Sequence, residues 1–153
     1  MNADNTQGPS SEDRLKDFCM NPEVTSVTIT SLYTTTDSPS GIPSLNLGNH
    51  CSDGNFYYSG LTKTGLPIGC SEISRDIEFC QNKGIKILLS IGGPDANALT
   101  LSSPYKGVEF AKWLVNTFGP KPFRYNGPRP FDRPGHTVVL DGFDLDLEFA
   151  TSE

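Results

Sequence analysis

Residues 138–148 read Val-Val-Leu-Asp-Gly-Phe-Asp-Leu-Asp-Leu-Glu, and our prediction of the fold starts from them. Its second half alternates strictly between apolar and acidic residues, which is the period of a β-strand. One face of such a strand carries Asp144, Asp146 and Glu148, with neighbouring Cα atoms roughly 6.6 Å apart. The other face carries Phe143, Leu145 and Leu147, which we expect a covering helix to bury.

Three carboxylates in a row on the inner face of a sheet do not favour stability, because like charges repel each other. When such groups are close and partly desolvated, at least one pKa rises and the groups titrate as a coupled set. A general acid that works near neutral pH needs a pKa raised in this way. The apolar run Val138–Leu140 before the acids is typical of a parallel strand buried on both faces. We therefore predict a catalytic strand.

Two other interpretations of this stretch remain. The first is a solvated acidic strand at the edge of a sheet, which the buried character of the preceding apolar run disfavours. The second is a calcium-binding loop, which needs a glycine-bearing turn and oxygen ligands without bulky residues between them. The large apolar residues between the acids argue against a calcium loop.

The acids of this stretch follow the pattern Asp-x-x-Asp-x-Asp-x-Glu, and they are Asp141, Asp144, Asp146 and Glu148. This pattern resembles the chitinase signature of glycoside hydrolase family 18. The resemblance implies an α/β fold, the eight-stranded (β/α)8 or TIM barrel, and an enzyme that hydrolyses chitin. It also implies that residues 1–153 are part of a family 18 catalytic domain.

Two further strands are predicted upstream of the acidic stretch. Residues 24–32 are rich in β-branched residues, and residues 85–91 read Ile-Lys-Ile-Leu-Leu-Ser-Ile, the clearest buried strand of the sequence. Between them, residues 33–69 show no helical period and contain many Gly, Pro, Ser and Asn, so we predict a long loop. Residues 121–135 are rich in Pro and Arg and predict a second loop before the catalytic strand.

Helices are predicted between these segments. Ser10 and Ser11 are expected to cap a short helix over residues 15–18, after residues 1–9, which we expect to be disordered. A second helix is expected to begin with a cap at Ser71 and to end at Gly84. Its apolar face carries Ile73, Ile77 and Cys80. A third helix is expected to begin at Ser103-Pro104 and to end at Gly119-Pro120, and its buried stripe is predicted as Val108, Ala111, Val115 and Phe118.

Strands that alternate with helices imply parallel β/α units. A complete barrel usually takes about 250 residues, whereas this sequence of 153 residues predicts only three strands. We therefore expect a fragment, a partial (β/α)8 barrel that contains roughly strands 2 to 4 with their helices. The long loop follows the first visible strand.

The turn Ser90-Ile91-Gly92-Gly93 ends the strand predicted over residues 85–91. In β/α barrels the chemistry lies at the carboxyl ends of the strands, so this turn should lie beside Asp146 and Glu148. Two glycines let the backbone approach a ligand without a Cβ in the way. The turn resembles the second signature of the family, and we take Ser90, Gly92 and Gly93 as candidate substrate-binding residues.

The resemblance also implies a mechanism for the acids. Glu148 would be the general acid, and the acetamido oxygen of the sugar would attack its own anomeric carbon. Asp146 would orient that acetamido group, and Asp144 would share a proton with Asp146. Asp141 lies on the opposite face of the strand, so we assign it, with Gly142, to a structural motif. This chemistry needs no cofactor.

Four cysteines, Cys19, Cys51, Cys70 and Cys80, permit three pairings. No Cys-x-x-Cys unit is present and the two histidines are not at zinc-finger spacing, so we expect no metal site. Four buried free thiols are the alternative to disulfides. The cysteine spacing resembles the plant and fungal class III branch of the family, which implies Cys19–Cys80 and Cys51–Cys70 bridges.

Disulfides predict an extracellular, secreted protein, although residues 1–11 lack the basic and apolar regions of a signal peptide. We expect a truncated N-terminus to reconcile the two. The net charge of −6 argues against nucleic acid or an anionic membrane as partner. No apolar run approaches the roughly 20 residues needed to span a bilayer.

The expected substrate is chitin or an N-acetylglucosamine oligosaccharide, cleaved at β-1,4 linkages with retention. An endo-acting enzyme on N-glycan cores would share these residues. The alternative function is a non-catalytic carbohydrate-binding relative or an inactive truncated fragment. We expect the full-length protein to be a monomer. Loop aromatics could stack on sugars but are predicted to pack the loop onto the barrel; they are Tyr33, Phe56, Tyr57 and Tyr58.

Overall fold

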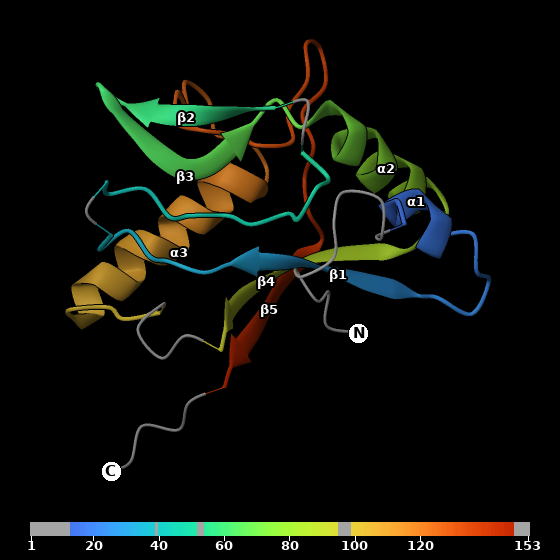
Figure 1. Ribbon diagram of the computed structural model, residues 1–153, viewed down its shortest axis with the longest axis horizontal. Helices are drawn as coiled ribbons and strands as arrows, with labels where there is room; N and C mark the ends of the chain where they lie inside the picture. Colours follow the sequence, from blue (N-terminus) through green and yellow to red (C-terminus); the bar gives the residue numbers. More distant parts are fainter. Residues whose placement is uncertain (1–12, 39, 52–53, 95–98, 149–153) are drawn as a thin grey trace.

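The computed structural model describes residues 13–38, 40–51, 54–94 and 99–148 (Figure 1). The expected disorder of residues 1–9 and the expected caps Ser10 and Ser11 lie outside these residues. The described helices are α1 (Leu15–Phe18), α2 (Ser71–Asn82) and α3 (Pro104–Phe118). The described strands are β1 (Ser26–Leu32), β2 (Asn55–Ser59), β3 (Thr62–Ile68), β4 (Lys86–Gly93) and β5 (Gly142–Leu147).

The central sheet is parallel, as the alternation of strands and helices predicts. Its order is β1-β4-β5, and both neighbouring pairs run in the same direction. Figure 1 shows α2 and α3 on the same side of this sheet, which follows from the right-handed crossover of parallel β/α units. The carboxyl ends of β4 and β5 therefore lie together at one edge of the sheet.

The long loop predicted over residues 33–69 is wrong in its second half. This part of the chain forms the antiparallel hairpin β2–β3. Gly65 and Pro67 interrupt the alternation of β3, so the sequence hides this strand. Residues 44–46 connect the hairpin to the sheet: Leu45 N–H donates to the Gly65 carbonyl at 2.9 Å, and Asn46 N–H donates to the Ser31 carbonyl at 3.0 Å.

Helix α2 begins one residue earlier than a cap at Ser71 would place it. Its N-cap is Cys70, without a side-chain hydrogen bond, and Ser71 is its first helical residue. The predicted face of α2 is confirmed, because Ile73, Ile77 and Cys80 are buried. At its end Gly84 has a φ of 82°, a value that favours glycine.

Helix α3 begins as predicted but buries a different face. The Ser103 side chain accepts a hydrogen bond from Lys106 N–H at 3.3 Å, and Pro104 occupies the first turn. The stripe predicted to be buried is exposed at Val108, Ala111 and Val115, and only Phe118 of it is buried. The face that packs on the sheet carries Phe110, Leu114, Thr117 and Phe118. The helix thus has two apolar stripes, and the sequence period alone does not say which one meets the sheet.

The predicted burial of the apolar face of β5 is wrong for two of its three residues. Leu145 is 65% exposed and Leu147 is 66% exposed. Phe143 is half-buried, and its ring centroid lies 6.4 Å from that of Phe118. The reason is position: β5 is the edge strand of the described sheet, and α3 covers only its first residues.

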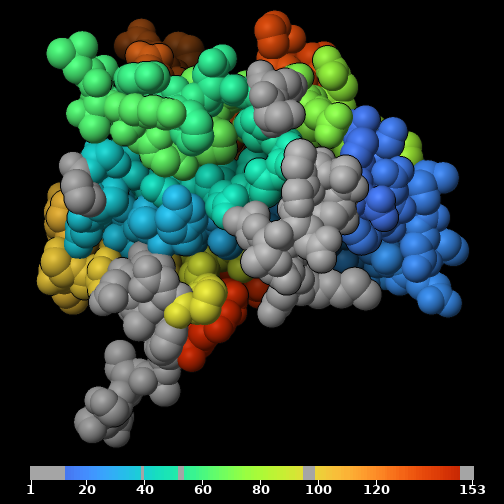
Figure 2. Space-filling view, viewed as in Figure 1, coloured from blue at the N-terminus to red at the C-terminus, as the bar shows by residue number. Residues whose placement is uncertain are grey.

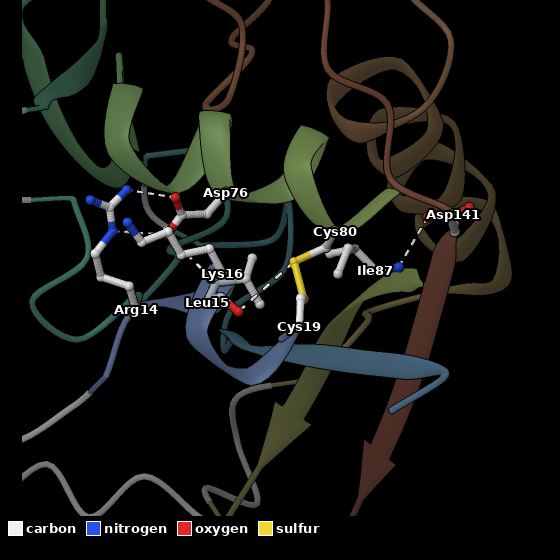
Figure 3. Close-up of a disulfide and its surroundings, with 8 residues drawn as sticks. All are labelled: Arg14, Leu15, Lys16, Cys19, Asp76, Cys80, Ile87 and Asp141. Atoms are coloured by element: carbon white, nitrogen blue, oxygen red, sulfur yellow. Dashed lines mark hydrogen bonds and ion pairs between the residues drawn. A yellow bond between two sulfur atoms is a disulfide. The ribbon is translucent and has the colours of Figure 1, made fainter. Parts of the chain in front are cut away.

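Both implied disulfides are present, and the alternative of free thiols is wrong. Cys19–Cys80 joins the end of α1 to α2 (Figure 3), and Cys51–Cys70 joins the segment before β2 to the start of α2. Beside the first bridge, Arg14 donates two hydrogen bonds to the buried carboxylate of Asp76, at 3.1 and 2.6 Å. These links fasten α1 onto α2.

Candidate active site

The acids of β5 lie on the face of the sheet away from α3. Phe143 packs toward α3, so alternation along the strand directs Asp144 and Asp146 to the opposite face. In the parallel register Asp144 pairs with Ser90, and Asp146 pairs with Gly92. Glu148 directly follows the last residue of the strand. The turn predicted over Ser90–Gly93 is instead the end of strand β4, because both glycines continue the pairing with β5. These residues and the acids therefore lie at the carboxyl ends of two neighbouring strands, as predicted.

The acids are more solvated than the sequence suggests. Asp144 and Glu148 are exposed, and Asp146 is half-buried. In this part of the chain β5 therefore has solvent-exposed acids, as the solvated edge strand that the sequence disfavoured would have. The carboxylates are not buried among the outer helices, an arrangement that would exclude a catalytic role.

Gly92 brings β4 close to the acidic strand. Its φ is 124°, and a Cβ at this position would overlap the carbonyl oxygen of Asp146 and lie 2.9 Å from its carbonyl carbon. Gly93 has a similar φ of 120°, but a Cβ there would meet no described atom within 4 Å. The missing side chain of Gly92 therefore lets the backbone of Asp146 lie directly against β4. The substrate contacts expected of Ser90, Gly92 and Gly93 stay predictions; Ser90 itself is buried.

Asp141 anchors the start of β5. Its carboxylate accepts hydrogen bonds from Ile87 N–H at 3.0 Å, Lys86 Nζ at 2.9 Å and Gln81 Nε2 at 2.9 Å. Figure 3 shows the hydrogen bond from Ile87 N–H. The N–H of Asp141 itself donates to the Ile87 carbonyl at 2.9 Å. Burial acts to raise the pKa of Asp141, but the hydrogen bonds from these three donors outweigh it and lower the pKa. The next residue, Gly142, also lies close to β4, because a Cβ there would be 3.2 Å from the Leu88 side chain.

Sequence reasoning missed Arg129, which holds the segment before β5. Its buried guanidinium donates to the carbonyl groups of Asn116, Gly119 and Val138, each at 2.8 Å. It also pairs with Asp132 at 2.9 Å, and Asp132 accepts a hydrogen bond from Val138 N–H at 3.1 Å. One residue thus ties the end of α3 to the approach of the acidic strand. A single Arg in a Pro-rich loop gives no sequence signal for this role.

The loops that follow β1 and β4 are joined at the same edge of the sheet. Thr35 Oγ1 donates to the Thr100 carbonyl at 2.9 Å, and Ser102 N–H donates to the Asp37 carboxylate at 2.8 Å. The hydrogen bonds from Ser102, and then the positive charge of Lys106, lower the pKa of Asp37 despite desolvation. The rim beside the strand ends is therefore fastened by polar contacts.

Within the residues that the structure describes, no group of three or more His, Cys, Asp and Glu side chains could hold a metal ion. The same part of the chain contains no helix long and apolar enough to cross a membrane.

Comparison with known proteins identifies the relatives of this chain. No protein-family model matches it. Endochitinase A of Aspergillus niger is 38% identical over 141 residues, which are 90% of this chain and 11% of that protein. Endochitinase A1 of Aspergillus fumigatus is 39% identical over 146 residues, 93% of this chain and 17% of that protein. Chitinase 2 of Rhizopus oligosporus is 31% identical over 145 residues, which are 95% of this chain and 24% of that protein.

Solved structures agree with these matches. The ICChI chitinase from Ipomoea carnea superposes with a TM-score of 0.64 and 29% identity, over 95% of this chain and 45% of that chain. This chain is a relative of the class III-type chitinases of glycoside hydrolase family 18. The xylanase and α-amylase inhibitor protein XAIP-II from Scadoxus multiflorus superposes with a TM-score of 0.67 and 27% identity, over 92% and 42%.

This chitinase relative corresponds to part of a family 18 fold. It spans 11 to 24% of the length of the three curated relatives and 42 to 45% of the two solved chains. Its parallel sheet and helices match a portion of the barrel in those structures. The expected fold class, a partial α/β barrel, is therefore confirmed.

Proposed function

We propose that this chain carries the acid residues of a retaining chitinase, which cleaves β-1,4 linkages between N-acetylglucosamine units in chitin catabolism. The observation that carries the proposal is the placement of Asp144 and Asp146 on the face of β5 away from α3, with Glu148 directly after the strand. The sequence identity of 38% and 39% to two fungal endochitinases, over at least nine-tenths of the chain, supports it.

Glu148 acts as the general acid and gives its proton to the glycosidic oxygen as the bond from that oxygen to the anomeric carbon breaks. The acetamido oxygen of the same sugar forms a new bond to the anomeric carbon, which yields an oxazolinium ion. Water then attacks the anomeric carbon from the face that the leaving group left, and Glu148 takes up the proton of that water. The configuration at this carbon is retained.

Asp146 accepts a hydrogen bond from the acetamido N–H and so aims the acetamido oxygen at the anomeric carbon. Its carboxylate also balances the positive charge of the oxazolinium ion. Asp144, two residues earlier on the same face, hydrogen-bonds Asp146 and shares a proton with it. The positions of these carboxylates depend on the contacts that seat β5, namely those of Gly92, Asp141 and Arg129.

The proposed partner is chitin or a soluble N-acetylglucosamine oligosaccharide, and the proposed place of action is outside the cell. The two disulfides support secretion, because such bonds persist in oxidising compartments. A monomeric full-length protein is part of the same proposal.

The test compares hydrolysis of a soluble chitin oligomer by the wild-type protein and by its Glu148→Gln variant. We expect the variant to lose about 10²-fold to 10⁴-fold in rate, the usual contribution of a general acid. Glu23→Gln is the matched control, because Glu23 is an exposed acid outside the sheet. Equal hydrolysis by wild type and Glu148→Gln would remove Glu148 from the mechanism.

A second candidate function is glycan binding without hydrolysis. It is favoured by the solvent exposure of Asp144 and Glu148, since a general acid is usually held in a drier site. Similarity to an inhibitor protein, XAIP-II, is compatible with it. Retention of wild-type protein on chitin together with no detectable hydrolysis would select this candidate.

A further inference from the structure

The β2–β3 hairpin has one face that packs on the molecule and one that does not. Tyr57 packs against the core, and its carbonyl accepts a hydrogen bond from Thr64 Oγ1 at 2.8 Å. Phe56 and Tyr58, one residue to either side of Tyr57, point to the other face. They are 43% and 56% exposed. The sequence prediction that these aromatics pack the loop therefore holds for Tyr57 but is wrong for its two neighbours.

A single cation belongs to this outer face. Lys63 pairs with Tyr58 in the antiparallel register, and its Nζ lies 4.1 Å from the centroid of the Phe56 ring. Lys63 is also the sole charged residue between Gly54 and Ser71. We call Phe56, Tyr58 and Lys63 the hairpin patch. In Figure 2 the hairpin, coloured green, forms an exposed upper edge of the molecule, far from the red end of β5.

The hairpin patch stands on a rigid base. The Cys51–Cys70 disulfide links the segments on either side of the hairpin. Gly54 lies so close to this bridge that a Cβ would come within 2.7 Å of the Ile68 carbonyl oxygen and would also overlap Cys51 Sγ. The hydrogen bond between Leu45 and Gly65 fastens the hairpin to the segment beside β1. Binding at this patch would therefore cost little ordering entropy.

We propose that the hairpin patch is a secondary binding surface for chains of N-acetylated sugars, separate from the acids of β5. Adjacent exposed aromatic rings on a rigid support mark a binding surface, because they offer large contact area at low entropic cost. Pyranose rings present apolar C–H faces to such rings, and their hydroxyl and acetamido oxygens accept hydrogen bonds from the Lys63 ammonium and the Tyr58 hydroxyl.

The charge of the patch selects the ligand class. Its one cation and the absence of any carboxylate between residues 54 and 71 suit an uncharged ligand rich in oxygen acceptors. The net charge of −6 on the chain as a whole disfavours a polyanion. The choice of an N-acetylated sugar rests on the proposed function, in which such a chain is the substrate. A surface of this kind would hold the protein on the polymer at a second place, away from the acids of β5.

The test measures retention on chitin particles and on cellulose particles, with Glu148→Gln in every protein so that the polymer stays intact. We expect Phe56→Ala with Tyr58→Ala to weaken binding to chitin by about tenfold, the equivalent of about 1.4 kcal/mol. Phe123→Ala is the matched control, because Phe123 is 91% exposed and lies under a cation, Arg124, at 5.1 Å. Circular dichroism shows whether each variant is folded, and Tyr58→Ala alone decides if the double variant is not.

Four results would overturn the inference. The first is unchanged retention of the double variant on chitin, and the second is an equal loss of retention in Phe123→Ala. The third is equal binding of the protein to chitin and to cellulose, which lacks acetamido groups. The fourth is self-association in sedimentation without glycan that depends on Phe56 and Tyr58. Failure of the proposed function is read separately, from hydrolysis by the protein that keeps Glu148. A chain that binds chitin through the hairpin patch but does not hydrolyse it would uphold this inference alone.

Discussion

Replacing Gly92 by alanine tests how β4 seats the acidic strand. A Cβ added to residue 92 would overlap the carbonyl oxygen of Asp146, so the two strands must separate for the side chain to fit. The φ of 124° adds backbone strain of about 1–3 kcal/mol. With the steric overlap included, we expect Gly92→Ala to lower the free energy of unfolding by about 3–5 kcal/mol.

Gly93→Ala is the control that separates the two contributions. Gly93 has nearly the same φ, 120°, but its Cβ would meet no described atom within 4 Å. We expect this variant to show the backbone strain alone, about 1–3 kcal/mol. Urea denaturation of both variants, followed by circular dichroism, gives the midpoint and the slope of each transition. Equal losses of stability in Gly92→Ala and Gly93→Ala would refute the close approach to Asp146.

Three further substitutions test other parts of the structure. Asp141→Asn should cost about 1–3 kcal/mol at neutral pH; because the folded pKa of Asp141 is lowered, this difference should be full above about pH 4 and shrink as the pH falls through the folded pKa. A pH-independent difference would contradict this. Leu145→Ser should change the free energy of unfolding by less than about 0.5 kcal/mol, since Leu145 is 65% exposed, and a loss above about 2 kcal/mol would mean that it is covered. Removing the Cys51–Cys70 bridge by a double Ala substitution should lower the free energy of unfolding by about 3 kcal/mol, as measured by thermal unfolding. An unchanged free energy of unfolding would show that these two cysteines are not bridged.

The acidic strand β5 could be predicted because its signal is local. Strict alternation from Phe143 to Glu148 fixes which residues share a face, and the structure keeps that parity. Alternation does not say what covers each face, however. The exposure of Leu145 and Leu147 depends on the position of β5 at the sheet edge, which involves contacts distant in sequence.

The elements that sequence reasoning missed depend on contacts between distant segments. Strand β3 contains Gly65 and Pro67, and it is stabilised by pairing with β2 and by a disulfide at the base of the hairpin. Helix α3 has two apolar stripes, and tertiary packing selects the one with Phe110. Arg129 gives no periodic signal because its partners are backbone carbonyl groups, which every residue has.

The most direct test of the mechanism uses two leaving groups. Glu148→Gln and wild type are compared on an N-acetylglucosamine oligomer, whose sugar leaving group needs a proton, and on a nitrophenyl glycoside, whose leaving group needs little help. If Glu148 gives its proton to the glycosidic oxygen, kcat/KM, which reports departure of the leaving group, should fall in the variant about 10²-fold or more on the oligomer and far less on the nitrophenyl glycoside. An equal loss on both substrates would contradict the role of Glu148 as the acid.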